Sequence, residues 1–161
     1  SGKTEDIERV QEYLSKEGYR AVRLPVATAF HSPIVEDSLG PFRDYLAGFT
    51  FSTPKTPVYS NSLARLYPDD EERCKDILAG QIVKPVRFVE QIDAMYAQGA
   101  RVFIEVGPGT VLTSLVDRCL KGKPHQTVFL DRRGRYGVDT VLSALVRLAT
   151  YGYKIDFHSL V

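Results

Sequence analysis

Apolar residues recur at helical spacing in several stretches of the chain. In the first, Ile7, Val10 and Leu14 follow Thr4, which can cap a helix, and Gly18 supplies a stop. A capping-box spacing of Asp69 and Glu72 predicts another helix start. Further helices are expected over Pro33–Leu46, Asp69–Leu78, Pro85–Tyr96, the stretch after Gly107-Pro108-Gly109, and Val138–Tyr151 with Val141, Leu142, Leu145 and Leu148 facing inward.

Shorter runs between these helices predict strands. Ala21–Leu24 alternates apolar and polar residues, as a half-buried strand does, and Val102–Val106 is apolar enough for a strand covered on both faces. Val58–Ser60 and Thr127–Leu130 are also expected strands, and Leu63–Pro68 an expected loop. Strands that alternate with helices indicate an α/β fold with a parallel sheet and flanking helices.

Composition narrows the class of function. The 161 residues carry 21 Lys and Arg against 20 Asp and Glu, a net charge of +1, which argues against nucleic acid as a partner. The apolar runs are too short for a membrane span or a signal peptide, so we expect a cytoplasmic protein. The two cysteines, Cys74 and Cys119, form no CxxC pair, so we expect reduced thiols and no metal centre.

Three histidines are candidates for proton transfer. His125 lies in a polar loop and His158 in a tail, and both are interpreted as solvent-facing. His31 lies instead at a strand-to-helix junction, where ligands of open α/β sheets bind and where an imidazole can move a proton near neutral pH. A helix-capping or packing role for His31 is the alternative.

The residues show no convincing nucleophile for such a base. A GxSxG elbow is absent, Ser32 adjoins His31 without facing it, and the two cysteines fall within helices. The Val106–Thr110 turn (VGPGT) can cradle an anion at a helix start. It lacks the GxGxxG spacing, so a tight turn in which glycine permits close backbone approach is the simpler interpretation. The charged residues 69–73 are interpreted as a solvated helix start.

Four ordered motifs resemble those of one enzyme family. They are LPVATAFHSP (24–33), PVYSN (57–61), GQIVKPVRF (80–88) and FIEVGPGTVLTSLV (103–116). Their order and spacing are similar to those of malonyl-CoA:acyl carrier protein transacylases and of the acyltransferase domains of polyketide, enediyne and polyunsaturated fatty acid synthases. The resemblance extends from Gly2 to about Asp131.

The resemblance implies a fold and a division of the chain. The family combines a large α/β-hydrolase-like subdomain with a small ferredoxin-like insert. Residues 1–25 would be a remnant of the insert, residues 26–136 the C-terminal half of the large subdomain, and residues 137–161 a final helix with the linker that follows the domain. The N-terminal half, with the serine elbow and the carboxylate-binding arginine, would lie outside this chain.

The resemblance also implies roles for individual residues. His31 matches the catalytic base of a Ser-His dyad, and Gln81 matches the position whose backbone carbonyl accepts the histidine Nδ1–H. Asn61 matches an asparagine beside the active site, and Phe30 a specificity position that is phenylalanine in malonyl-selective domains. Gly107 and Gly109 match an architectural GPG turn. Thr28 departs from the family pattern, because many modular malonyl domains have histidine there.

The implied reaction moves a malonyl unit from coenzyme A to the phosphopantetheine thiol of an acyl carrier protein. No permanently bound cofactor or metal is implied, and the implied partners are the carrier protein, the N-terminal half of the domain and a neighbouring ketosynthase. Two alternatives remain open: a non-catalytic flavodoxin-like module that uses the GPGT turn to bind an anion or to dock, and a degenerate acyltransferase kept for docking.

Overall fold

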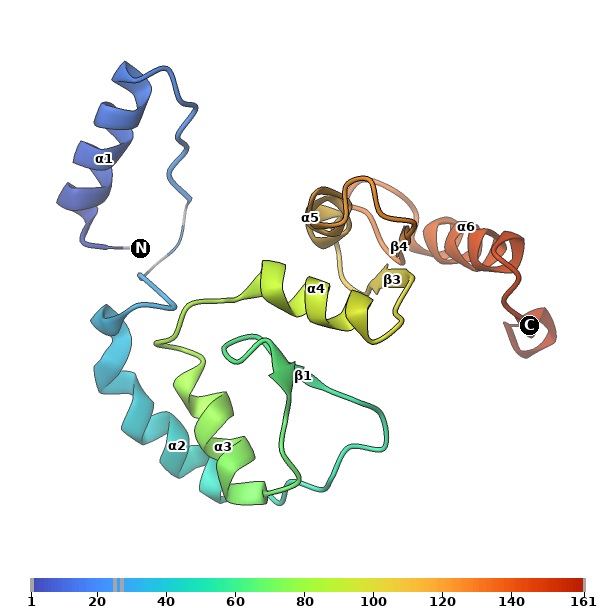
Figure 1. Ribbon diagram of the computed structural model, residues 1–161, viewed down its shortest axis with the longest axis horizontal. Coiled ribbons are helices and arrows are strands. Elements are labelled where there is room, and N and C mark those ends of the chain that lie inside the picture. Colours follow the sequence, from blue (N-terminus) through green and yellow to red (C-terminus); the bar gives the residue numbers. More distant parts are fainter. Residues whose placement is uncertain (1, 25, 27, 161) are drawn as a thin grey trace. The chain divides into compact units, whose positions relative to one another are not determined.

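The chain divides into two compact units. The computed structural model describes residues 2–24, 26 and 28–160, and its units are Ser1–Gln91 and Ile92–Val161. Figure 1 shows their elements in chain order. No helix of the described residues is long and apolar enough to cross a membrane.

Helix α1 (Thr4–Lys16) opens the first unit. The predicted cap is wrong by one residue, because Lys3 is the N-cap and Thr4 already belongs to the helix. Glu5 and Asp6 lie in the first turn, where the helix dipole favours negative charge, and the chain leaves the helix through Gly18 at φ +82°. The helix contains no buried residue.

The strand predicted at 21–24 is absent. Residues 21–24 form no ladder with any described segment, and Val22 and Leu24 are 67% and 69% exposed. A strand needs a neighbour for its backbone N–H and C=O groups, and an alternating sequence cannot supply one. The prediction was therefore wrong for the chain as the structure describes it.

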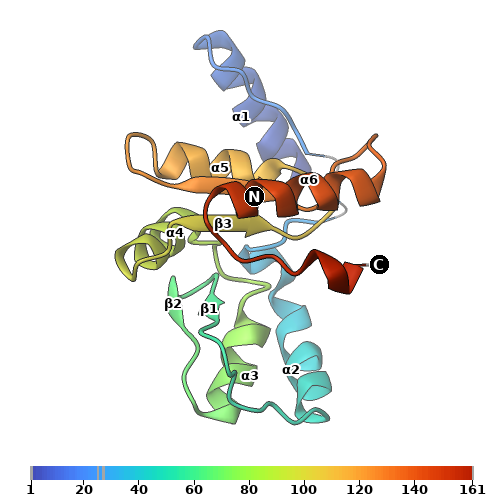
Figure 2. The same cartoon turned by 90° about the vertical axis from the view of Figure 1, so that its right-hand side faces the viewer.

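The helix predicted from Pro33 exists but is divided. A 3-10 helix, η1 (Pro33–Ser38), leads into α2 (Leu39–Ala47), with a break at Val35 (φ −102°, ψ 17°). Helix α3 (Glu71–Gly80) is capped by Asp70, whose carboxylate accepts the N–H of Arg73 at 2.7 Å; the predicted cap, Asp69, is one residue too early. In Figures 1 and 2, α2 and α3 lie side by side.

Ion pairs hold α2 to α3. Arg43 of α2 contacts Asp76 and also Glu72, whose carboxylate lies 2.6 Å away. Lys75, whose side chain is only 5% exposed, lies 2.8 Å from Glu71 and 3.2 Å from Glu72. Arg43 first and Lys75 second lower the pKa of Glu72. Asp69, Asp70, Glu72 and Arg73 are exposed, as expected for a solvated helix start, and the ion pairs of Glu71 and Glu72 add to that picture.

Two short strands complete the first unit. β1 (Tyr59–Ser60) pairs antiparallel with β2 (Arg65–Leu66), so Tyr59 faces Leu66 and Ser60 faces Arg65. The prediction of a strand here is confirmed for two of its three residues. The segment predicted as a loop contains β2. Helix α4 (Phe88–Ala97) begins three residues after Pro85 and runs across the boundary between the units.

The second unit contains a parallel pair of strands, as expected. β3 (Val102–Glu105) pairs with β4 (Gln126–Phe129), and Ile104 lies opposite Val128. Helices α5 (Val111–Cys119) and α6 (Gly137–Thr150) and the 3-10 helix η2 (Phe157–Leu160) complete it. β3 is not covered on both faces by described residues, since Ile104 is 45% exposed.

The core of this unit lies between β4 and α6. Val128 packs with Ala144 and Leu148, and partly buried Val102, Leu130, Tyr151 and Ile155 surround them. The buried row of α6 is Thr140, Ala144 and Leu148, each four residues after the last and so on one helix face. The prediction that Val141 and Leu142 face inward was wrong, because both are exposed.

Leu120, the C-cap of α5, provides a test of packing elsewhere in the second unit. It is 0% exposed, whereas Leu112 on α5 is 48% exposed. We expect Leu120→Ala to lower the free energy of unfolding by about 2–5 kcal/mol, because it leaves a cavity. Leu112→Ala, the same chemical change, should cost less than about 1 kcal/mol. Urea denaturation measures both, and equal losses would contradict the packing described.

Candidate active site around His31

The backbone of His31 adopts a conformation that is rare for residues with a side chain. Its φ is +62°, in the left-handed region. The His31 N–H donates to the carbonyl of Ile82 at 2.8 Å, and the next hydroxyl, of Ser32, donates to the carbonyl of Ala29 at 2.6 Å. Non-glycine residues are held in this region only where surrounding contacts compensate for the strain, and such positions cluster at functional sites.

The imidazole of His31 is anchored through one nitrogen. Nδ1 lies 2.9 Å from the carbonyl oxygen of Gln81 and 3.2 Å from that of Lys84. Carbonyl oxygens only accept hydrogen bonds, so Nδ1 must carry the proton to make either bond. The lone pair of the neutral ring then lies on Nε2, and Nε2 contacts no partner among the described residues. The arrangement therefore presents a free basic nitrogen.

The segment that follows α3 provides the backbone carbonyls that accept hydrogen bonds from His31. Its own N–H groups turn back on the helix: Gln81 donates to Leu78, and both Val83 and Lys84 donate to Gly80. The carbonyls of Gln81, Ile82 and Lys84 accept none of these turn hydrogen bonds and accept from His31 instead. The contact of Gln81 is made by its backbone.

Asn61 is tied to the continuation of the same segment. Its carbonyl accepts the N–H of Arg87 at 2.8 Å, directly after β1. The stretch 81–87 thus contacts His31 at one end and Asn61 at the other. The side-chain amide of Asn61 makes no hydrogen bond to a described residue.

A pocket of about 530 Å³ lies beside His31. Phe30 and His31 form part of its wall, together with Ile7 of α1 and residues of the segment before His31. Its apolar lining residues include Ile7, Val22, Leu24, Val26 and Phe30. The structure therefore brings the predicted base and the predicted specificity residue to one cavity.

The other histidines and the cysteines differ in their surroundings. His125 was expected to face solvent, but its side chain is only 12% exposed. Its ring nitrogens lie 2.7 Å from the carbonyl of Lys123 and 3.1 Å from the carboxylate of Asp117. His158 is exposed. Cys74 donates its S–H to the carbonyl of Pro68, and burial raises the pKa of the thiol, which disfavours a nucleophilic thiolate.

The GPG turn already contains a negative charge. The carboxylate of Glu105, at the end of β3, accepts the N–H of Thr113 in the first turn of α5 at 2.7 Å. Neither Gly107 nor Gly109 has a positive φ, and the nearest described atom to a side chain at Gly109 would be the Glu105 carboxylate, 4.0 Å away. The close backbone approach expected at this turn is therefore absent among the described residues.

Sequence reasoning missed two parts of this geometry. The carbonyls of Ile82 and Lys84 are backbone groups, so no residue type at these positions signals their contacts with His31. Glu105 ends β3, five residues before the N-cap Thr110, so its contact with the first turn of α5 depends on how the GPG turn folds back and was not evident from the sequence. Among the described residues, no group of three His, Cys, Asp or Glu side chains is placed to hold a metal ion.

Comparison with known proteins places these features in a family. The family model described as "Acyl transferase domain" matches residues 1–153. Over 126 residues the chain is 37% identical to one of the subunits of the polyunsaturated fatty acid synthase of Thraustochytrium sp. (strain ATCC 26185 / S-3), a match that covers 77% of this chain and 4% of that protein.

Solved structures are similar to this chain along nearly its whole length. The acyl transferase domain of SpnD, in complex with 2-(pent-4-yn-1-yl)malonyl, superposes with a TM-score of 0.87 at 27% identity, over 94% of this chain and 38% of that one. A malonyl-transacylase in complex with a type II polyketide synthase acyl carrier protein gives 0.78 at 25% identity, over 91% and 45%. The chain thus spans less than half of each of these matched proteins.

Glu105 allows a test of the turn's own charge. We expect Glu105→Ala to lower the free energy of unfolding by about 1–2 kcal/mol, because the start of α5 loses a charged cap. Glu105→Gln should lose less, because its amide oxygen still accepts from Thr113. Urea denaturation distinguishes them, and a Glu105→Ala variant as stable as the wild type would show that the contact contributes nothing.

Proposed function

We propose, for a chain that belongs to the acyl transferase domain family, that it supplies the catalytic base of a malonyl-CoA:acyl carrier protein acyltransferase. His31 is that base. The observation that carries the proposal is the bond between Nδ1 of His31 and the carbonyl of Gln81, at 2.9 Å, which leaves Nε2 free to accept a proton.

The first half-reaction uses Nε2 as base and then as acid. Nε2 takes the proton of a serine hydroxyl as its oxygen attacks the malonyl thioester carbonyl. When the carbon–sulfur bond breaks, the imidazolium returns that proton to the coenzyme A thiolate, and the malonyl group stays on serine as an ester. The sequence has no GxSxG elbow, so this serine comes from outside the 161 residues.

The second half-reaction repeats the cycle in reverse. Nε2 deprotonates the phosphopantetheine thiol of the carrier protein, and the thiolate attacks the ester. The serine oxygen leaves and recovers the proton. In both halves the carbonyl oxygens of Gln81 and Lys84 stabilise the positive ring, the part that an aspartate plays in a Ser-His-Asp triad.

The similar proteins and the pocket support malonyl-CoA as the substrate and an acyl carrier protein as the partner. One matched structure is described as a carrier protein bound to its malonyl-transacylase, and another contains a substituted malonyl group. Phe30 lines the pocket beside His31. In this proposal its ring takes up room that an α-substituent would need and so favours malonyl over α-substituted extenders. A neighbouring ketosynthase belongs to the same proposal, as does a supporting role for Asn61.

The arrangement of subdomains is also proposed. Residues 1–25 form a remnant of a ferredoxin-like insert, residues 26–136 the C-terminal half of the large subdomain, and residues 137–161 the final helix and linker. The family match covers residues 1–153 as one stretch, which supports membership of the domain for most of the chain; the internal boundaries are part of the proposal.

The anion-binding alternative has less support. Glu105 occupies the N–H of Thr113 at the helix start, so an incoming anion would meet a carboxylate instead of a free donor. We therefore favour catalysis at His31 over anion binding at the GPGT turn.

Replacement of His31 tests the proposed base. In the full-length protein, His31→Ala should lower malonyl transfer to the carrier protein by about 10²–10⁴-fold, because the serine loses the group that accepts its proton. Radiolabelled malonyl-CoA measures the transfer. His158→Ala, the same change at an exposed histidine, is the matched control; a His31→Ala variant within about threefold of the wild type would exclude His31 as the base.

Replacement of Phe30 tests the proposed selectivity. Phe30→Ser should raise the kcat/KM of methylmalonyl-CoA relative to malonyl-CoA by about 10–200-fold, because it makes room for an α-methyl group. Competition between the two thioesters measures the ratio. Phe49→Ser, at a ring that packs on Tyr45 outside the pocket, is the control. Equal ratios in all three proteins would refute the role of Phe30.

A further inference from the structure

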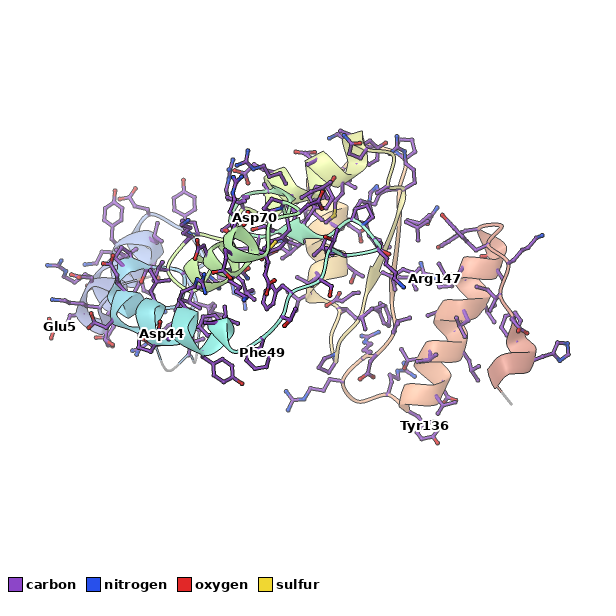
Figure 3. All side chains as sticks on the ribbon, turned by 90° about the horizontal axis from the view of Figure 1, so that it is seen from below. Glu5, Asp44, Phe49, Asp70, Tyr136 and Arg147 are labelled. Atoms are coloured by element: carbon purple, nitrogen blue, oxygen red, sulfur yellow. The ribbon has the colours of Figure 1, made fainter. Side chains whose placement is uncertain are left out.

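Another pocket lies within the second unit, between β4 and α6. It has a volume of about 250 Å³, and Val128 and Phe129 of β4 form one side. The first turns of α6 and the loop before it form the rest, and Arg147 reaches it from the last turn. Figure 3 labels Tyr136, at the start of α6, and Arg147, toward its other end.

Positive charge dominates the lining of this pocket. Arg132, Arg135 and Arg147 contribute guanidinium groups, and Asp139 is the one carboxylate among the lining residues. Neutral hydroxyl groups complete the polar lining: Tyr136, Thr140 and Ser143. This excess contrasts with a chain whose net charge is only +1.

A tight turn brings two of these arginines together. The N–H of Arg135 donates to the carbonyl of Arg132 at 3.1 Å, and Gly134 between them adopts φ +82°. Glycine tolerates this left-handed conformation, so the chain can reverse there without steric cost. The turn places Arg132 and Arg135 in the pocket wall, whereas Arg133 does not line it.

None of the three guanidinium groups forms an ion pair with a described residue, although Asp139 lines the same pocket. Arg147 donates only to the neutral hydroxyl of Tyr151, at 3.1 Å. Neighbouring cations without a partner repel one another, and a bound anion would relieve that repulsion. Arginine is suited to this, because its planar fork binds phosphate oxygens in pairs.

We propose that this pocket binds a phosphate group, carried either by a nucleotide or as free diphosphate. Its volume is below the roughly 300–1,000 Å³ of pockets that enclose whole drug-sized ligands, so it accommodates the charged group and leaves the remainder outside. The site shares no lining residue with the pocket beside His31, and binding there needs no acyl transfer.

Calorimetric titration of the full-length protein at low ionic strength tests this site. The probes are sodium diphosphate and adenosine 3′,5′-bisphosphate. Both should bind, and Arg132→Ala and Arg135→Ala should each weaken binding about tenfold, since each removes a charge-assisted contact. Tighter binding of the nucleotide by about tenfold or more identifies a nucleotide phosphate, whereas comparable binding identifies free diphosphate; both results support the site.

Two variants distinguish binding in the pocket from nonspecific attraction of an anion to the positive charge of this loop. Arg133→Ala removes the same charge from the same loop outside the pocket, and it should change the affinity by less than about twofold. Asp139→Asn removes the lining carboxylate and should tighten binding several-fold. Absence of binding at millimolar diphosphate overturns the proposal. So do equal losses for Arg133→Ala and Arg135→Ala, or saturation by an acidic peptide at lower concentration than by either phosphate.

Discussion

The candidate site depends on one contact, between Nδ1 of His31 and the carbonyl oxygens that follow α3. The 2.9 Å bond to Gln81 and the 3.2 Å approach to Lys84 fix both the orientation of the ring and the nitrogen that carries its proton. The same segment accepts the backbone N–H of His31 through Ile82 and so maintains the left-handed φ of +62°. Loss of this segment would remove the ring's support and the backbone's support together.

Helix α3 leads directly into that segment. Asp70 caps its N-terminus, and Arg43 and Lys75 pair with its acidic side chains, of which Glu72 contacts both cations. The carbonyls that hold His31 begin at Gln81, directly after this helix ends. The ion pairs of Arg43 and Lys75 thus lie on the helix from whose C-terminal end the carbonyls project.

The sequence predicted the elements well where the pattern is local. The stretches predicted as helices at α1, α3, α5 and α6 are helical, and β3 pairs parallel with β4. The expected contact between His31 and the backbone carbonyl of Gln81 is present, whereas the functional roles of His31, Gln81 and Phe30 stay predictions. The predictions that were wrong depend on which segments pack together. Ala21–Leu24 has no neighbouring described strand to pair with, and Val141 and Leu142 are exposed and do not belong to the buried row of Ala144 and Leu148. The contacts of Ile82 and Lys84 are made by backbone atoms, which side-chain patterns do not encode.

Nitrogen NMR of the full-length protein with labelled histidine tests the central claim most directly. The shifts of Nδ1 and Nε2 report which nitrogen carries the proton of the neutral ring. For His31 we expect Nδ1 to be protonated and Nε2 to be bare. This state should be unchanged in Gln81→Ala, which keeps the carbonyl, and lost in Gln81→Pro, which alters the local backbone. A proton on Nε2 in the wild type, or the same change in both variants, would contradict it.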